Sequence, residues 1–344
     1  MFSLSNFDFM LPDDLVAAKP LEHREASRML IVDRSAGSFD DDRFQRLPEI
    51  LRRDDLLVLN NTKVFPARLH GKTETGGNVE VFLVRDLGDG VWETLARPAK
   101  RLKAGRQIIF DEFLTAEALD RGDDGKVVVR FSGSGDLIEQ FERIGRTPLP
   151  PYIKRGRDDI DTDRERYQTV YAKNRGAIAA PTAGLHFTPD ILGRLRDRGI
   201  EIAEITLHVG YGTFEPVRSD DLSKHSVLPE QYEIGQATAE ILNIAKQAGR
   251  RIIAVGTTTT RTLEYNFASH GEFVAGSGFA DLTILPGFKF AAIDGLLTNF
   301  HLPKSSLLVL VSTFGGHELI MEAYRHAVAS RYRFYSYGDC MLIV

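Results

Sequence analysis

Several short polar segments follow apolar, strand-like runs, and their side chains are of types that bind polar ligands or move protons. Four of these segments are residues 60–62, 182–186, 256–261 and 298–301, and His208 follows a fifth apolar run. They offer amides, hydroxyls, imidazoles and one guanidinium. In an open α/β sheet, ligands bind at the edge where the strands reach their carboxyl ends. We therefore expect segments that are far apart in the sequence to meet in a single crevice.

The residue types at these positions favour acid–base chemistry on a polar organic substrate. His186, His208 and His301 carry imidazoles, which exchange protons near neutral pH. A lone histidine more often has a structural role, and three at predicted strand ends shift that balance somewhat toward catalysis. These segments hold no paired carboxylates, and the chain has no H-E-x-x-H motif. Its single cysteine, Cys340, excludes a multi-cysteine metal centre, so we expect no metal.

The segment 256–261, which reads GTTTTR, opens a predicted helix. Hydroxyls and free backbone N–H groups at a helix start bind carboxylates or phosphates, and Arg261 is a possible counter-charge. Threonines also cap helices when no ligand is present, so the structural interpretation stays open. The chain has neither the G-x-x-x-x-G-K-[ST] pattern nor a G-x-G-x-x-G fingerprint opening a helix.

The elements that position these residues are most clearly predicted in the segment 176–214, as one β-loop-α-β unit. Residues 177–180 form a short apolar run that predicts a strand, and the proline that follows must end it. Thr188 is the expected N-cap of a helix that Gly199 ends. A second strand is expected at 200–207. The small-residue loop between strand and helix lies where open α/β sheets hold their ligands.

The rest of the chain alternates between helical and strand patterns on both sides of a stretch rich in hairpins. Further strands are predicted at 28–32, 56–59, 250–255 and 296–300, two strands at 332–344, and a strand with a short helix within 1–20. Helices are predicted at 136–144 and 238–248, then after Ser305 and at 317–329. Between about residues 69 and 131, alternating runs separated by turn dipeptides predict about six antiparallel strands, enough to close a small barrel. The expected fold class is therefore mixed α/β. Its main domain spans residues 1–68 and 146–344, and a β-barrel domain is inserted at 69–145.

Composition and charge are those of an ordinary globular protein of two domains. The 344 residues are 43% hydrophobic, and a formal charge of −5 argues against indiscriminate nucleic-acid binding. Residues 97–106 nevertheless hold five basic side chains and no acid, a pattern typical of a solvated rim or of a nucleic-acid contact. The stiff linker 148–155 is followed by further basic residues. One cysteine and no recognisable targeting or membrane segment lead us to expect a cytoplasmic protein with no membrane partner.

Eight longer motifs narrow the interpretation. They are NNTKVFPARL at Asn60, PLPPYIKR at Pro148, RYQTVYA at Arg166, GAIAAPTAGLHF at Gly176, TLHVGYGTFEPV at Thr206, IIAVGTTTTRTLE at Ile252, LLTNFHLPKSSLLVLV at Leu296 and YRFYSYGD at Tyr332. Together they closely resemble the S-adenosylmethionine:tRNA ribosyltransferase-isomerase family of queuosine synthesis. The resemblance runs from Asn6 almost to the last residue.

The resemblance implies a reaction in which S-adenosylmethionine is consumed as a substrate. The family transfers and isomerises its ribosyl group onto 7-aminomethyl-7-deazaguanine at the tRNA wobble position, which yields epoxyqueuosine, adenine and methionine. The sulfonium acidifies the ribose C5′ proton, and a base removes it. Ring opening then expels adenine, the nucleobase amine attacks the sugar, and epoxide closure expels methionine. The implied partner is tRNA carrying the aminomethyl base, and we expect a monomer rather than an oligomer.

Family roles are transferred residue by residue as hypotheses. The proton transfers are assigned to His186 and His208. Binding of S-adenosylmethionine is assigned to Asn60, Asn61, Thr182, Ala183, Gly184, Thr257, Thr258, Arg261, Asn299 and His301. Contact with tRNA is assigned to Arg97, Lys100, Arg101, Lys103, Tyr152, Lys154, Arg155 and Arg157. One departure is visible, because Leu228 stands where many relatives carry a second histidine after His225, so that histidine's role does not transfer.

Two alternatives stay open at this point. A tRNA methyltransferase would use the same sulfonium compound and leave S-adenosylhomocysteine, but the glycine-rich loop expected after its first strand is missing. A non-catalytic tRNA-binding protein would use the barrel and the basic linker. It would leave the polar strand ends with a capping role only.

Overall fold

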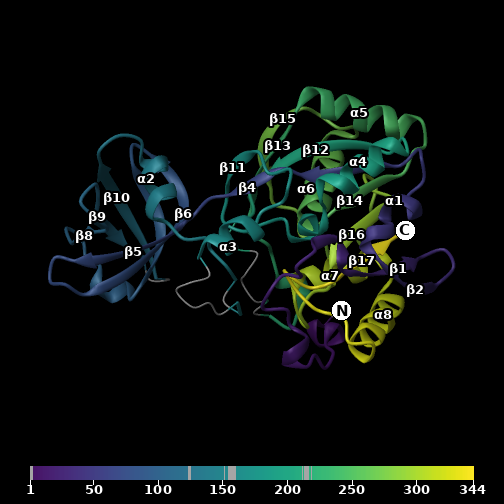
Figure 1. The fold of residues 1–344 in the computed structure, drawn as a ribbon, viewed down its shortest axis with the longest axis horizontal. Coiled ribbons are helices and arrows are strands. Elements are labelled where there is room, and N and C mark those ends of the chain that lie inside the picture. The colour runs from purple at the N-terminus through teal and green to yellow at the C-terminus, as the bar shows by residue number, and fades with distance from the viewer. Residues whose placement is uncertain are drawn as a thin grey trace. The chain divides into compact units, whose positions relative to one another are not determined.

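The computed structural model describes residues 3–122, 125–150, 152–153, 160–210, 212, 217 and 219–344 (Figure 1). The chain forms two compact units. The main unit comprises Met1–Lys63, Pro151–Lys154 and Gln168–Val344, and the barrel unit comprises Val64–Pro150 and Arg155–Tyr167. Throughout the described ranges, no helix combines the length and apolar character needed to cross a bilayer.

The main unit is built on a nine-stranded mixed sheet with strand order β15-β13-β12-β3-β14-β16-β17-β1-β2. Its strands are β1 (Arg28–Asp33), β2 (Ser38–Arg43), β3 (Leu56–Asn60), β12 (Glu201–Leu207), β13 (Glu230–Ile234), β14 (Ile252–Val255), β15 (Gly276–Ala280), β16 (Gly295–Asn299) and β17 (Cys340–Ile343). The four strands β12, β3, β14 and β16 are neighbours and run parallel. Their carboxyl ends therefore lie along one edge, as predicted.

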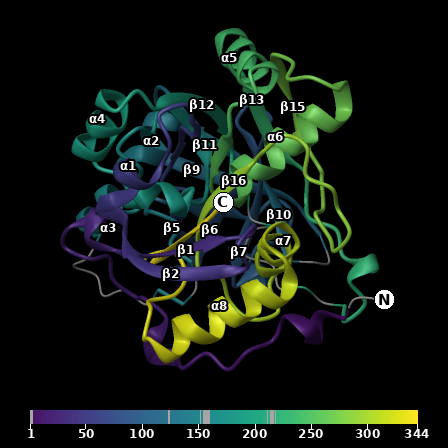
Figure 2. The ribbon, with the colours of Figure 1, turned by 90° about the vertical axis from the view of Figure 1, so that its right-hand side faces the viewer.

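The central strands are apolar along their whole length because helices cover them. Every residue of β3, β14 and β16 is buried, which is typical of parallel strands in α/β proteins. The helices are α1 (Leu47–Ile50), α4 (Pro189–Asp197), α5 (Gln236–Gln247), α6 (Thr257–His270), α7 (Ser306–Gly315) and α8 (His317–Ala329). Helices α4, α5 and α6 contact the central strands, and α8 packs beside β1, next to α7 (Figure 2).

Helix α4 forms as its sequence predicts. The hydroxyl of Thr188 accepts a hydrogen bond from the backbone N–H of Ile191 (3.2 Å), and Pro189 opens the helix. Gly199 follows the helix with a φ of +79°, a conformation that glycine adopts without strain. The buried face, which includes Ile191 and Leu195, joins the core cluster beneath β3 and β14.

Three local predictions are wrong. The strand expected at 177–180 is instead β11 (Asn174–Ala177), which pairs with β4 (Thr62–Val64) outside the large sheet, and the 3-10 helix η7 (Thr182–His186) follows it. Of the two strands expected at 332–344, only β17 forms. Residues 332–339 are a loop whose backbone N–H groups donate to separate places: that of Arg333 to the Asp339 carboxylate, that of Phe334 to Leu15 and that of Tyr335 to Phe300. At the amino terminus, the 3-10 helix η1 (Leu4–Phe7) replaces the expected strand, whereas the expected short helix forms as the 3-10 helix η2 (Asp13–Leu15).

The barrel unit contains a closed antiparallel barrel with strand order β10-β7-β6-β5-β8-β9. Its elements are β5 (Arg68–Thr73), β6 (Asn78–Gly88), β7 (Val91–Arg97), η5 (Ala99–Arg101), β8 (Gln107–Ile109), β9 (Leu114–Arg121), β10 (Lys126–Gly133), α2 (Leu137–Ile144) and α3 (Ile160–Arg166). Buried Trp92, Thr94 and Ala96 alternate with more exposed residues along β7, so one face of the strand fills the barrel. The predicted fold class is confirmed. The unit is longer than the predicted insertion, and the domain boundaries at 69 and 145 stay a prediction.

Candidate active site

The candidate site lies at the edge where the four parallel strands end. Strand β3 ends at Asn60, β14 at Val255 and β16 at Asn299, and His208 directly follows β12. The 3-10 helix η7 does not follow a strand of this sheet, yet it contacts β16 and brings His186 to the same edge. The edge thus gathers the segments that the sequence predicted to converge.

His186 is held by hydrogen bonds at both ring nitrogens. Its Nε2 lies 3.1 Å from Oδ1 of Asn299, and its Nδ1 lies 2.7 Å from Oγ of Ser27. The side-chain nitrogen of Asn299 donates to the carbonyls of Tyr335 (2.9 Å) and Ser336 (3.2 Å), so its oxygen faces His186, while the Ser27 hydroxyl also donates to the carbonyl of Arg24 (2.7 Å). Burial lowers the pKa of His186 to about 4, and the ring is neutral near pH 7. These contacts fit a positioning residue.

His208 differs because one of its ring nitrogens is available. Nδ1 lies 2.8 Å from the hydroxyl oxygen of Thr62, which also lies 3.4 Å from the backbone oxygen of Asn174. Nε2 has no protein partner among the described residues, and in the tautomer with the proton on Nδ1 it offers a lone pair. Burial lowers the pKa of His208, opposed by Glu233, so the ring is neutral near pH 7. The ring packs on Gly176, where an added Cβ would lie 2.7 Å from it.

Asn60 and Asn61 are engaged by the protein itself. The amide of Asn60 accepts from the backbone N–H of Leu207 (3.0 Å) and donates to its carbonyl (3.0 Å), so it joins β3 to β12. Asn61 donates to Glu204 (3.1 Å) and accepts from Thr206 (2.8 Å). Asn60 is completely buried. Their predicted contact with S-adenosylmethionine stays a prediction, and the observed bonds fit a structural role.

The start of α6 presents two threonines to the site. Thr259 and Thr260 turn their hydroxyls back to the carbonyls of Val255 (2.7 Å) and Gly256 (3.2 Å). In the part of the chain that the structure describes, the hydroxyls of Thr257 and Thr258 have no such bond. An added Cβ at Gly256 would lie 3.8 Å from Ala183 of η7, so the two segments are in contact. This helix start retains the donors that an anion needs.

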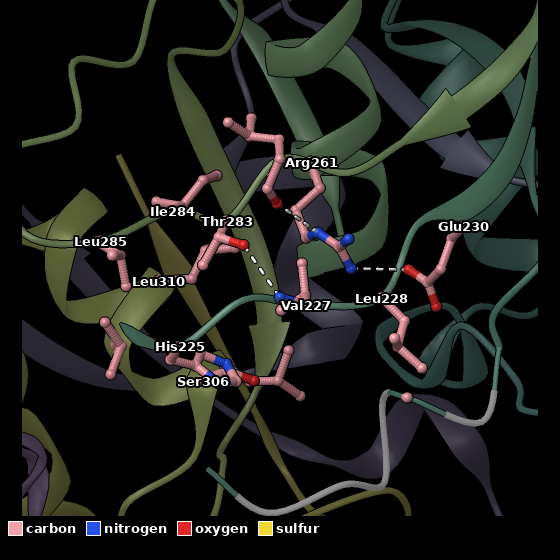
Figure 3. Close-up of a pocket in the computed structure, with 14 residues that line it drawn as sticks. His225, Val227, Leu228, Glu230, Arg261, Thr283, Ile284, Leu285, Ser306 and Leu310 are labelled. Carbon is pink, nitrogen blue, oxygen red and sulfur yellow. Dashed lines mark hydrogen bonds and ion pairs between the residues drawn. The ribbon is translucent and has the colours of Figure 1, made fainter. Parts of the chain in front are cut away.

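Arg261, one turn further along α6, forms a buried ion pair. Its Nη1 lies 2.8 Å from Oε2 of Glu230, and both side chains are buried. Its other bonds to described residues are to the backbone oxygens of Leu282 (3.1 Å) and Ala280 (3.4 Å). The other oxygen of Glu230 accepts from the N–H of Gly210 (2.9 Å). Figure 3 shows this pair at one side of a pocket that is otherwise mainly aliphatic.

The remaining predicted residues are packed into the interior of this edge. Nε2 of His301 lies 3.0 Å from the hydroxyl of Thr298, and burial lowers the pKa of His301 to about 3. Gly184 contacts Tyr171, whose hydroxyl oxygen would lie 2.0 Å from a Cβ added at this glycine. Thr182 opens η7, beside Ala183. No cluster of three metal-binding side chains occurs among the residues described.

Comparison with known proteins identifies the family. A family model described as "Queuosine biosynthesis protein" matches residues 4–343. The chain belongs to this queuosine biosynthesis family. It is 48% identical to the S-adenosylmethionine:tRNA ribosyltransferase-isomerase of Trichlorobacter lovleyi over 99% of both chains. It is 50% identical to that of Syntrophotalea carbinolica, again over 99% of both chains. The crystal structure of S-adenosylmethionine tRNA ribosyltransferase from Thermotoga maritima is similar, with a TM-score of 0.57 and 37% identity over 99% of this chain and 100% of that one. The predicted family resemblance is confirmed.

In this queuosine biosynthesis protein, sequence reasoning missed the residues that orient His186. Ser27 precedes β1 and had no distinguishing pattern. Tyr335 and Ser336 lie in the motif YRFYSYGD, whose only signal was the family resemblance. Tyr335 adopts a φ of +74°, its ring lies 4.5 Å from that of Tyr152, and the Tyr152 hydroxyl accepts from the N–H of Ser336 (3.1 Å). Strained backbone beside a site is a feature of functional loops.

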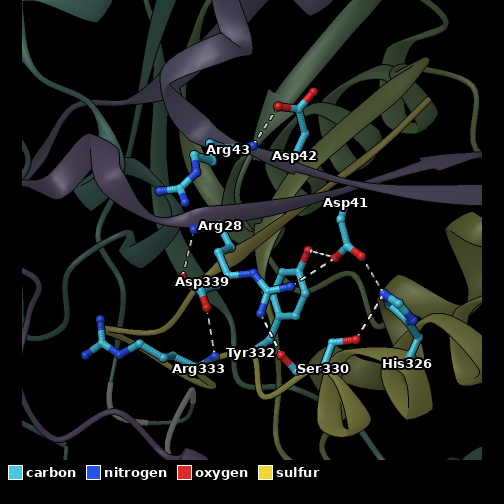
Figure 4. Close-up of polar contacts among 9 residues, drawn as sticks. All are labelled: Arg28, Asp41, Asp42, Arg43, His326, Ser330, Tyr332, Arg333 and Asp339. Atoms are coloured by element: carbon cyan, nitrogen blue, oxygen red, sulfur yellow. Dashed lines mark hydrogen bonds and ion pairs between the residues drawn. The ribbon is translucent and has the colours of Figure 1, made fainter.

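The loop 332–339 is anchored by two carboxylates (Figure 4). Asp339 accepts from the backbone N–H groups of Arg28 (2.9 Å) and Arg333 (2.8 Å), and burial raises its pKa. Asp41 on β2 bonds the Tyr332 hydroxyl, Nη2 of Arg28 (3.2 Å) and Nε2 of His326 (2.9 Å). These contacts tie the loop to β1, β2 and α8.

The barrel unit of this family member carries the predicted basic segment. Lys100, Arg101, Lys103 and Arg106 line a recess together with Thr73, Thr75 and Gly77, which we call the basic recess. Arg97 lines a neighbouring hollow with His70 and Arg146. Tyr152 belongs to the main unit, where it contacts Tyr335. Lys154, Arg155 and Arg157 lie outside the described residues.

Proposed function

We propose that this chain is an S-adenosylmethionine:tRNA ribosyltransferase-isomerase. It transfers and isomerises the ribosyl group of S-adenosylmethionine onto 7-aminomethyl-7-deazaguanine at the tRNA wobble position, and releases adenine and methionine. The observation that carries this conclusion is 48–50% identity to enzymes of that name over nearly the whole of both chains. The edge where the parallel strands end supports it, since imidazoles and an uncapped helix start lie there.

The base of the first step is His208. Its Nε2 lone pair takes the C5′ proton of the ribose, and the electron pair left on carbon is stabilised by the adjacent sulfonium. Thr62 keeps the second nitrogen protonated, so the ring takes up a single proton and becomes an imidazolium. A base with a pKa below neutral is already deprotonated at physiological pH. His186 acts through Asn299 and the loop 332–339, as a positioning residue for the neighbouring substrate.

The adenosine part lies along the strand ends and η7. Thr182, Ala183, Gly184, Asn299 and His301 surround it, with Asn60 and Asn61 supporting the crevice from beneath. The carboxylate of the methionine part is attracted to the start of α6, where Thr257, Thr258 and Arg261 lie on one face. S-adenosylmethionine is a substrate, and the chemistry needs no metal.

The tRNA partner is bound by basic side chains. The basic recess holds phosphates of tRNA carrying the aminomethyl base, together with Arg97, Tyr152, Lys154, Arg155 and Arg157. A local cluster of this kind reconciles a chain of net charge −5 with a polyanionic partner. The enzyme works as a monomer in the cytoplasm.

Product analysis tests the function. The purified chain is incubated with S-adenosylmethionine and tRNA bearing 7-aminomethyl-7-deazaguanine, and adenine, methionine and modified tRNA are quantified. All three are expected in equal amounts. S-adenosylhomocysteine would instead identify a methyltransferase, and tRNA binding without any product would identify a binding protein.

A further inference from the structure

A narrow pocket adjoins the start of α6 in the main unit. It is lined by loop 225–230, segment 282–285 and the first turns of α7, with Arg261 at one side (Figure 3). Arg261 follows Thr257 and Thr258 by about one helical turn, so the three side chains lie on the same face of α6. The pocket is therefore next to the helix start at the strand-end edge.

The walls of this pocket suit a short aliphatic chain. They are formed by Val227, Leu228, Leu282, Ile284, Leu285, Leu307, Val309 and Leu310. Among the lining residues that the structure describes, the imidazole of His225 is the sole ring, and most of the others are aliphatic. Leu228 is 53% exposed and forms part of the outer wall, so a bound chain would cover apolar surface that now faces water.

The buried ion pair supplies charges of both signs. A guanidinium has five N–H donors, and within the described part of the chain Arg261 uses three of them, on Glu230, Leu282 and Ala280. Two donors remain for a carboxylate, which a planar guanidinium binds well. A ligand with adjacent positive and negative groups would meet both members of the pair and add no net charge to the interior.

Two further polar groups in the pocket have unused hydrogen-bonding capacity. Nε2 of His225 is buried and has no partner within the described ranges. The hydroxyl of Thr283 accepts from the backbone N–H of Val227 (3.0 Å) and still has its own hydrogen to donate. A buried polar atom without a partner costs stability, which a suitable ligand atom would restore.

We propose that this pocket receives the methionine end of S-adenosylmethionine. Its carboxylate binds the two uncommitted donors of Arg261, its ammonium faces Glu230, and its carbon chain and sulfur lie along the aliphatic walls. The adenosine then extends toward the strand ends. The inference rests on the proposed function, and it extends the assignment of Arg261 by placing the whole methionine part of that substrate in one pocket.

The test measures the affinity of the full chain for L-methionine, used as a probe, by titration calorimetry. Leu228→Arg places a charged chain in the outer wall, and Leu87→Arg is its control, an exposed leucine of the barrel unit. Arg261→Lys keeps the positive charge opposite Glu230 but removes the planar guanidinium that binds a carboxylate through two N–H groups. His225→Ala removes the imidazole whose Nε2 has no partner in the described structure. We expect L-methionine affinity to fall about tenfold or more in Leu228→Arg and Arg261→Lys, with a smaller loss in His225→Ala. Binding of 5′-methylthioadenosine, which lacks the amino acid group, is expected to change less than about twofold.

Steady-state constants separate this inference from the proposed function. KM for S-adenosylmethionine is expected to rise in the pocket variants while KM for tRNA stays constant. Unchanged L-methionine affinity in Leu228→Arg and His225→Ala would overturn the inference, even if Arg261→Lys did not fold. A rise confined to KM for tRNA would also overturn it and would assign the pocket to the aminomethyl base. If the wild-type chain bound L-methionine but formed no products, the function would fail and the pocket assignment would stand.

Discussion

The side-chain oxygen of Asn299 lies 3.1 Å from Nε2 of His186, although 113 residues separate them in the sequence. Two backbone carbonyls of the loop 332–339 fix the orientation of this amide so that its oxygen faces the ring of His186. His208, by contrast, has a ring nitrogen with no protein partner in the described part of the chain. The two histidines that look equivalent in the sequence thus have different capacities for chemistry.

We expect His208→Gln to lower the rate of the chemical step by about 10²–10⁴-fold, because it removes the proton acceptor. KM for S-adenosylmethionine should stay within a few-fold. Single-turnover release of adenine measures the step, and His23→Gln, at an exposed histidine, is the control. Retention of the full rate would exclude His208 as the base.

The wild-type rate should fall on the acid side of neutrality. A base accepts a proton only when it is unprotonated, and burial lowers the pKa of His208. The rate is therefore expected to be constant from about pH 7 to 8 and to decline only below His208's ordinary pKa of about 6.5. A decline that begins above pH 7 would contradict this prediction.

Acid should destabilise the fold through two buried histidines. The pKa values of His186 and His301 fall to about 4 and about 3, from 6.5, so the unfolded chain binds more protons than the folded chain in that interval. Stability is then complete above about pH 6.5 and is lost as the pH falls toward 4, by about 3 kcal/mol for His186 alone. Urea denaturation at several pH values measures this loss. His186→Gln should flatten the profile, and an unchanged profile would count against the burial argument.

Replacing Asn299 by aspartate should raise the pKa of His186. A carboxylate beside Nε2 favours the protonated ring, and it also loses the two bonds to the carbonyls of Tyr335 and Ser336. NMR titration of the imidazole follows the pKa, and Asn243→Asp on α5, remote in the fold from His186, is the control. If the pKa of His186 stayed near 4, the contact would not govern its protonation.

Gly184→Ala should destabilise the site, because the new methyl would lie 2.0 Å from the hydroxyl oxygen of Tyr171. That hydroxyl has no hydrogen-bond partner in the described structure, so Tyr171→Phe alone should cost little. The double variant should recover part of the lost stability, since the clashing oxygen is gone. Thermal denaturation of the wild type, the two single variants and the double variant gives a double-mutant cycle. Stability changes that simply add in the double variant would disprove the contact.

The basic recess should govern the salt dependence of tRNA binding. Lys100→Ala combined with Lys103→Ala should weaken binding and reduce the slope of log affinity against log salt by about 2. Lys289→Ala, an exposed lysine of the main unit, should leave the slope unchanged. Equal slopes in all three proteins would exclude phosphate contact by the recess.

Local patterns in the sequence were sufficient for most of the architecture. The capped helix α4, the parallel strands β3, β14 and β16, and the hairpin signals of the barrel depend on residues close together in the chain, and the structure has them. Proline, glycine and N-cap residues act within one turn of the backbone, which makes them readable without tertiary information. The family could likewise be recognised without tertiary information, because its long motifs occur in the same order along the chain.

Only the tertiary structure decided which side chains of the site are free to meet a substrate. Asn60 and His186 look like ligand-binding residues in the sequence, yet packing brings Leu207, Ser27 and the loop 332–339 to their polar atoms and satisfies them. The prediction of a strand at 177–180 was wrong for a similar reason. A strand needs a neighbour to pair with, and the segment that pairs here is β11, whose partner is β4 and not a strand of the main sheet. Hydrogen-bond satisfaction depends on distant segments meeting, and no local pattern encodes that meeting.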